Sequence, residues 1–288
     1  MTLQEVREFL EAHIRQEAAS MFGLAPGPWL ERVTDNWFND ARNYDGRWAL
    51  IEERGAAGGR ILDMAAGCGT FVLYGLHRGH DVVGIEPEGW KREYFQHKIS
   101  AAGYPDAWRD RVVEAVGEEL PFPDACFDLV TTYQTLEHVR DVNQCLSEML
   151  RVLKPGGVLY ARAPDYNSFF EPHYRLPFLP RMNRRVAAAY LKALGRPVEG
   201  LNTLNWVTGR GVRRDIRELD PRALIEDNRR WYARDRVDRI RRKLPAPLRS
   251  GAAVAMADAL CGVRNGLIGL AKTGREEKTM DLWVTRGN

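Results

Sequence analysis

The sequence lacks several features that would assign it to a membrane, secreted or cysteine-rich class. It has no uninterrupted run of roughly 18 to 20 apolar residues, the length that a membrane-spanning helix needs. Its first residues, MTLQEVREFLEAHIRQEAA, are acidic and amphipathic, whereas a signal peptide begins basic and continues apolar. Its four cysteines form neither CxxC pairs nor a disulfide framework, which argues against a cysteine zinc site. We therefore expect an ordinary globular protein of the cytoplasm.

The chain also lacks a strong net charge, since 42 Lys and Arg oppose 39 Asp and Glu for a formal charge of +3. The distribution is uneven, because the segment 229–249 carries nine Lys or Arg and two Asp, a local charge of +7. Three interpretations of this basic segment stay open. It could be a solvated helix face, a patch for an anionic acceptor such as a sugar nucleotide or lipid pyrophosphate, or a nucleic-acid contact.

Short apolar runs alternate with helical patterns after residue 60. The runs ILDMAA, DVVGIE, FDLVTTY and GVLYARAP read as strands, and the stretch 141–153 reads as a helix. Further strands are predicted at 222–227 and in TMDLWVTRG near the end of the chain. Strands that alternate with helices imply right-handed crossovers and a parallel sheet with helices on both faces.

Two kinds of segment depart from this alternation. Residues 1–55 read as a helical cap, with apolar positions four apart and a break at AlaProGlyPro, and we expect the main domain over 56–288. Long insertions at about 165–215 and 228–275 read as lids over a binding site. An apolar stripe from Met256 to Leu270 in the second insertion suits a core or dimer contact, or a peripheral membrane contact.

The turn after the first predicted strand lacks the third glycine of a dinucleotide-binding fingerprint. Gly67 and Gly69 are present, but Val72 occupies the third position of GxGxxG. Asp63 precedes the turn, and its carboxylate would repel a pyrophosphate but suits a ligand that carries an ammonium and a sulfonium. Glu86 ends the second strand, where it can accept hydrogen bonds from both ribose hydroxyls. These two acids predict S-adenosylmethionine (SAM) as the cofactor.

The residues that follow carry the motifs GEELPF, FDLV, LEHV and LKPGG between 117 and 157. Together with the turn and its acids, they resemble the class I SAM-dependent methyltransferases of the type-11 group over about residues 60–165, with weaker support at 202–219 and 279–286. The resemblance implies an α/β, Rossmann-like, seven-stranded mostly parallel sheet with an antiparallel last strand, and S-adenosylhomocysteine as product. It also implies that the cofactor is bound by Asp63, Ala65, Gly67, Gly69, Glu86, Pro87, Gly117, Glu118, Thr132, Tyr133 and Gln134.

Two positions depart from the pattern of the group. Ala65 replaces the usual first glycine, a mild change because a methyl group still allows close approach. Val116 stands where an acid commonly bonds the adenine amino group, so we expect Glu118 or the main chain to take that role.

Methyl transfer is an in-line displacement at an activated carbon, so alignment and exclusion of water can supply most of the acceleration. A hydroxyl acceptor would also need its proton removed, and His138 is the candidate base because the pKa of an imidazole can lie near neutrality. The alternative is that LEHV is a structural motif in which His138 packs or caps. Asp165, after the fifth strand, could orient a base or bind substrate, or could cap a turn.

The acceptor side is predicted from the segment after that strand. Aromatic and Arg side chains there suit a ring-bearing or anionic acceptor, although a lid packed on the sheet edge would use the same residues. The expected substrate contacts are Tyr166, Phe170, His173, Tyr174 and Arg175. Polyprenyl-phenol O-methyltransferases, which resemble this chain, bind a metal through Glu-x-x-Glu-His; here the first acid is the amide Gln134. A hard cation prefers charged oxygen ligands, so we predict no metal.

Three functional hypotheses follow from these observations. The first is a small-molecule methyltransferase, monomer or homodimer, directed at a hydroxyl of a sugar, envelope-glycan precursor or natural product. The second is an RNA or protein methyltransferase that docks through the basic segment 229–249. The third is a SAM-binding protein without catalytic activity. No appended RNA-binding motif and no Asn/Asp-Pro-Pro-Tyr/Phe signature of DNA methyltransferases accompanies the basic segment.

Overall fold

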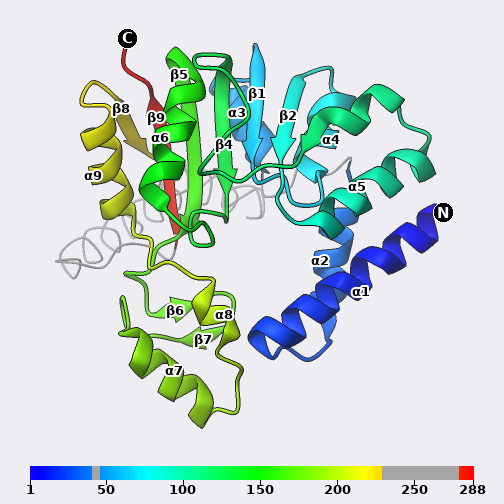
Figure 1. Ribbon diagram of the computed structural model, residues 1–288, viewed down its shortest axis with the longest axis vertical. Helices are drawn as coiled ribbons and strands as arrows, with labels where there is room; N and C mark the ends of the chain where they lie inside the picture. The colour runs from blue at the N-terminus through cyan, green and yellow to red at the C-terminus, as the bar shows by residue number, and fades with distance from the viewer. Residues whose placement is uncertain (41–45, 229–278) are drawn as a thin grey trace, which may run out of the picture.

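The computed structural model describes residues 1–40, 46–228 and 279–288. Its centre is a seven-stranded sheet in the order β3-β2-β1-β4-β5-β9-β8 (Figure 1). Strand β9 runs antiparallel to both of its neighbours, and the other pairings are parallel, which confirms the predicted fold class. The strands are β1 (Arg60–Met64), β2 (Asp81–Ile85), β3 (Val112–Val113), β4 (Phe127–Tyr133), β5 (Leu153–Pro164), β8 (Leu224–Asp227) and β9 (Thr279–Thr285). The basic segment and the Met256–Leu270 stripe lie outside the described residues.

Successive residues of a strand point to opposite faces of the sheet. The strands carry apolar residues on both faces, and helices cover both. Leu62 of β1 joins a core with α6 (Val142–Val152) and α9 (Gly209–Leu219). Its neighbour Ile61 joins a core on the other face with α3 (Arg47–Glu53), α4 (Thr70–His77) and α5 (Gly89–Ala102). A 3₁₀ helix at Asp106–Arg111 leads into the short β3, a strand that the sequence patterns did not indicate.

The N-terminal residues form the expected helices. Helix α1 (Leu3–Phe22) begins with a capping box between Thr2 and Glu5, and α2 begins with a proline (Pro28–Phe38). Val6, Leu10 and Ile14, the apolar residues spaced four apart in α1, are all buried. They share a core cluster with Leu30 of α2 and Tyr94 of α5. None of the described helices combines the length and the hydropathy that a membrane span requires.

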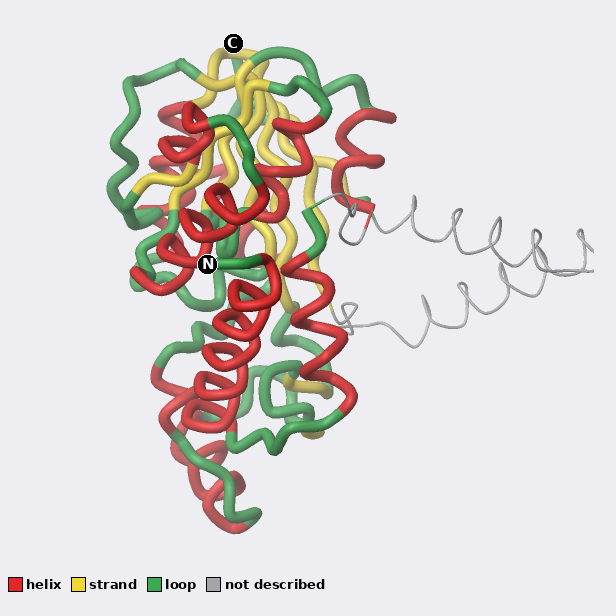
Figure 2. Tube along the Cα trace, turned by 90° about the vertical axis from the view of Figure 1, so that its right-hand side faces the viewer, coloured by secondary structure: helices red, strands yellow, loops and turns green. Residues whose placement is uncertain are grey.

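The chain leaves the sheet after β5 and builds a small layer beyond the end of the strands, beside α1 (Figures 1 and 2). This insert contains β6 (Phe170–Glu171), β7 (Leu176–Pro177), α7 (Arg184–Ala193) and α8 (Glu199–Asn202). It has its own apolar cluster around Tyr174, and Phe22 at the end of α1 packs against that cluster. The insert and the N-terminal helices therefore meet across the edge where β1, β2 and β4 end.

Two helical glycines offer a matched test of how tightly the helices pack on the sheet. A Cβ on Gly75 of α4 would lie 2.4 Å from the Trp48 ring and 2.7 Å from Val82, whereas a Cβ on Gly89 of α5 would meet no atom within 4 Å. We predict that Gly75→Ala lowers the free energy of unfolding by about 1 to 3 kcal/mol through overpacking. Gly89→Ala should leave it unchanged or raise it slightly. Urea unfolding measures both, and equal effects of the two substitutions would contradict the packing argument.

Candidate cofactor and acceptor site

A cavity of about 640 Å³ opens where β1, β2 and β4 end. Parallel strands bring their carboxyl ends to one edge of a sheet, which is where ligands bind in open α/β folds. The opposite wall comes from α1, α2 and the insert, through residues such as Phe22, Trp37 and Thr203. The cavity is lined by these sequence-predicted residues: Asp63, Ala65, Gly67, Glu86, Pro87, Gly117, Glu118, Tyr133, Gln134, His138 and His173.

Glu86 fixes the turn that faces this cavity. One carboxylate oxygen accepts the Gly67 N–H and the other accepts the Glu88 N–H, each at 2.9 Å. Burial raises the pKa of Glu86, while the charge of Lys91 opposes that rise. Each carboxylate oxygen can accept a second hydrogen bond, so the side chain keeps acceptor capacity for a ligand hydroxyl.

The two turn glycines serve different purposes. Gly67 has a φ of 55°, and a Cβ there would meet no atom within 4 Å, so the main chain lies open to a ligand. Gly69 has a φ of 77°, and a Cβ there would lie 2.3 Å from the Phe95 ring. Gly69 is therefore required for packing against α5, and it does not line the cavity. The open main chain at Gly67 beside the acceptor oxygens of Glu86 fits a nucleoside cofactor.

Arg47 is a cavity residue that the sequence patterns did not reveal. Its guanidinium forms a buried ion pair with Asp63 and donates to Thr131 Oγ1 at 2.8 and 3.0 Å. Burial raises the pKa of Asp63, and the charge of Arg47 counteracts that effect. Because Arg47 comes from α3 in the N-terminal region, no spacing near the glycine turn could have indicated it. Both residues of the pair line the cavity.

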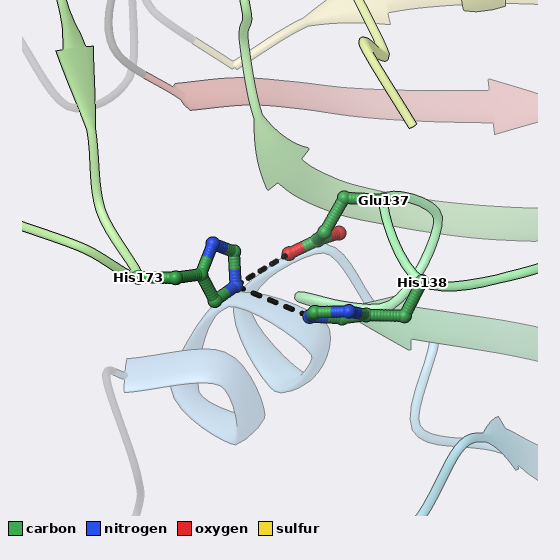
Figure 3. Close-up of side chains that lie close together, drawn as sticks. All are labelled: Glu137, His138 and His173. Atoms are coloured by element: carbon green, nitrogen blue, oxygen red, sulfur yellow. Dashed lines mark hydrogen bonds and ion pairs between the residues drawn. The ribbon is translucent and has the colours of Figure 1, made fainter. Parts of the chain in front are cut away.

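Three side chains converge at the insert side of the cavity (Figure 3). His138 Nε2 lies 3.1 Å from His173 Nε2, which in turn lies 4.0 Å from Glu137 Oε1. Burial raises the pKa of Glu137 to about 7. Desolvation and the adjacent His173 lower the pKa of His138 to about 3, so its ring is neutral near pH 7. The pKa of His173 is raised, because the hydrogen bond and charge of Glu171 and the charge of Glu137 outweigh burial.

Several other predicted site residues lie outside the cavity lining. Asp165 accepts the N–H groups of Asn167 at 2.9 Å and Gly209 at 3.1 Å, a turn role in which its carboxylate joins β5 to the start of α9. Thr132 is buried within β4. Neither Asp165, the acid expected to orient a base or bind substrate, nor Thr132 lines the cavity. The positions of these residues in the sequence did not show that β4 would bury the Thr132 side chain or that main-chain donors would occupy the Asp165 carboxylate.

The insert directs one of the five predicted substrate residues, His173, into the cavity. Tyr174 is only 1% exposed in the core of the insert, and the Tyr166 hydroxyl donates to buried Glu171 at 3.2 Å. Phe170 lies in β6, and the guanidinium of Arg175 lies over the Trp29 ring. An irregular segment has no periodicity, so the sequence could not indicate which of its aromatics would turn inward.

The buried ion pair predicts a large difference between two arginines. Arg47→Ala removes the compensating charge from Asp63, which is 1% exposed, and should lower the free energy of unfolding by about 3 to 5 kcal/mol. Arg7 pairs with Asp35 at 2.7 Å on the surface, so Arg7→Ala should cost less than about 1 kcal/mol. Denaturant unfolding of both variants tests the difference, and equal losses would show that the buried pair carries no special weight.

Comparison with known proteins shows that this chain is similar to methyltransferases. The family described as "Methyltransferase domain" matches residues 62–161, from β1 into β5. A ubiquinone/menaquinone biosynthesis C-methyltransferase UbiE of Desulfotalea psychrophila is 30% identical over 219 residues, 69% of this chain and 85% of that protein. UbiE of Geotalea daltonii is 38% identical over 114 residues, which cover 38% of this chain and 48% of that protein.

A solved structure shares the fold. Phosphoethanolamine N-methyltransferase 2 of Haemonchus contortus, in complex with phosphomonomethylethanolamine and S-adenosylhomocysteine, superposes with a TM-score of 0.53 at 14% identity. The alignment covers 98% of this chain and 60% of that one. With the family match and the UbiE relative, the conclusion is that this chain belongs to the class I SAM-dependent methyltransferases of the type-11 group.

Proposed function

We propose that this enzyme transfers the methyl group of SAM to a hydroxyl oxygen of a small molecule in the cytoplasm, such as a sugar, an envelope-glycan precursor or a natural product. The observation that supports this proposal is the position of His138 and His173, which line the same cavity as the Glu86 turn. Their ring nitrogens can bond an acceptor hydroxyl on the insert side, while the carboxyl ends of the strands hold the cofactor.

The cofactor is assigned to the turns that end β1, β2 and β4. Glu86 is proposed to accept the ribose hydroxyls, and the open main chain at Gly67 lets the ligand approach closely. Asp63 and Arg47 suit the ammonium and carboxylate of a methionine moiety, and Glu118 lies in the wall proposed for adenine. When bound, SAM supplies a methyl carbon that an acceptor atom attacks as the sulfur leaves.

The acceptor hydroxyl is proposed to lie against His138 and His173. A neutral His138 can accept a hydrogen bond from the hydroxyl and orient its oxygen. His138 Nε2 lies 3.1 Å from His173 Nε2, however, and desolvation together with this neighbour lowers the pKa of His138, which weakens it as a base. We therefore assign His138 an orienting role in the metal-free protein, and no base role to Asp165, whose carboxylate is occupied by main-chain donors away from the cavity.

C-methylation is a second candidate, favoured by the relatives whose names include C-methyltransferase. A ring carbon beside a phenol becomes a better nucleophile when the phenol loses its proton, so the same hydroxyl contact would serve both reactions. The position of the new methyl group distinguishes them.

Incubation with SAM carrying a ¹³C-methyl group, together with fractionated extract of the source cell, tests the proposed reaction. We expect one labelled small molecule, whose methyl group NMR and mass spectrometry locate on oxygen. Label on a ring carbon would support the second candidate. Label only in an RNA or protein fraction, or no transfer despite SAM binding, would contradict small-molecule methylation.

Glu86 offers the sharpest test of the cofactor assignment. Glu86→Ala removes a charged acceptor from the proposed ribose contacts, so calorimetry should show SAM binding weakened roughly tenfold to a hundredfold. Glu114→Ala is the matched control, because Glu114 is an exposed acid near the end of the neighbouring β3 and does not line the cavity. Its affinity for SAM should equal that of the wild type. Unchanged affinity in Glu86→Ala would refute the ribose assignment.

A further inference from the structure

The cluster of Glu137, His138 and His173 brings three metal-ligating atoms together from two distant segments of the chain. The first two residues lie in the turn after β4, and His173 lies in the turn between β6 and β7 of the insert. One ligand atom from each residue lies within 4.8 Å of the other two. The two histidines line the cavity, so the point of convergence faces the space proposed for the acceptor.

Glu137 supplies an independent observation. Its side chain is 0% exposed, and neither carboxylate oxygen has a hydrogen-bond partner among the described residues. Burial of an unsatisfied carboxylate is costly, so such groups are normally paired, hydrogen-bonded or bound to a metal. The nearest cationic candidate, His173 Nε2, is 4.0 Å away, which is too long for a hydrogen bond. The carboxylate therefore has the capacity to bind a ligand of positive charge.

The outer contact of the His173 ring matches that of metal-binding histidines, which usually donate their second ring N–H to a carboxylate or a carbonyl. His173 Nδ1 lies 2.7 Å from Glu171 Oε1. Glu171 is held in turn by the Tyr166 hydroxyl and the Tyr174 N–H. These contacts hold the His173 ring with its Nε2 atom 3.1 Å from His138 Nε2.

The separation of the nitrogens fits coordination. Two imidazole nitrogens bound to one tetrahedral Zn²⁺ at about 2.0 to 2.1 Å lie about 3.3 Å apart. The observed Nε2 to Nε2 distance is 3.1 Å. The Glu137 oxygen, at 4.0 Å from His173 Nε2, must approach that nitrogen by roughly 0.7 Å to complete the same tetrahedron.

We propose that Glu137, His138 and His173 form a binding site for a divalent transition metal ion of the Zn²⁺ class. Two imidazoles and one carboxylate suit such ions, whereas Mg²⁺ and Ca²⁺ prefer all-oxygen sites. The sequence-based prediction of no metal considered oxygen ligands around Gln134 and could not include His173, which joins the cluster only through the fold. Because His138 and His173 line the cavity, an acceptor there could reach an ion held by them. If the proposed function holds, a bound ion would take the acceptor hydroxyl oxygen as a ligand and lower the pKa of that hydroxyl, whose proton would pass to solvent.

Titration with Co²⁺ tests the site without reference to activity. The full chain, expressed without a polyhistidine tag and stripped with a chelator, is titrated with Co²⁺ while the visible absorption of the ion is followed. We expect a band that saturates at one equivalent and disappears when Zn²⁺ is added. His173→Ala and Glu137→Gln should each weaken Co²⁺ binding roughly tenfold or more. His97→Ala is the matched control, because His97 is a surface histidine beside Glu93 and should leave the band unchanged.

Calorimetry with SAM on each variant establishes that the fold is intact, and Glu137→Gln preserves the shape of the buried side chain. The absence of a saturable band in the wild type, or an unchanged band in His173→Ala or Glu137→Gln, would overturn the metal site. Methyl transfer by protein that binds no Co²⁺ would refute the site and leave the proposed function standing. Stoichiometric Co²⁺ binding without transfer to any acceptor would do the reverse.

Discussion

The buried contact of Arg47 with Asp63 and Thr131 joins the N-terminal helices to the centre of the sheet. A carboxylate at the end of a central strand is costly in a low-dielectric interior unless a cation compensates it. Arg47 of α3 supplies that cation, so the ion pair holds α3 against β1 and β4. Helix α3 packs on the same sheet face as α4, the helix that follows the glycine turn. The N-terminal helices close one side of the cavity, so the cavity walls depend on this pair as much as on the strands.

The sequence predicted the features that are encoded locally. Apolar runs, the glycine turn and the acids beside it follow from short-range patterns, and β1, β2 and the Glu86 turn appear where these patterns placed them. Features that depend on distant segments were not predicted. Arg47 reaches the site from α3, and His173 meets Glu137 only because the insert folds back on the turn after β4.

Packing rather than ligand contact explains several sequence signals that seemed functional. Gly69 makes room for the Phe95 ring, and Tyr174 fills the core of the insert. The turns at the ends of the strands form one side of the cavity, whereas the insert and the N-terminal helices contribute to the opposite wall. The family match at residues 62–161 runs from β1 into β5 and includes neither the insert nor the N-terminal helices, so the acceptor has to be found by experiment.

Hydrogen exchange with and without S-adenosylhomocysteine tests most directly the claim that the turns after β1, β2 and β4 form the cofactor site. Amide exchange should slow at 64–70, 85–89 and 116–118 when the ligand is bound. Exchange should not change in α7, which lies in the insert away from the cavity lining. Unchanged exchange in all three segments despite ligand binding, or slowing confined to α7, would contradict the assignment of the cofactor site.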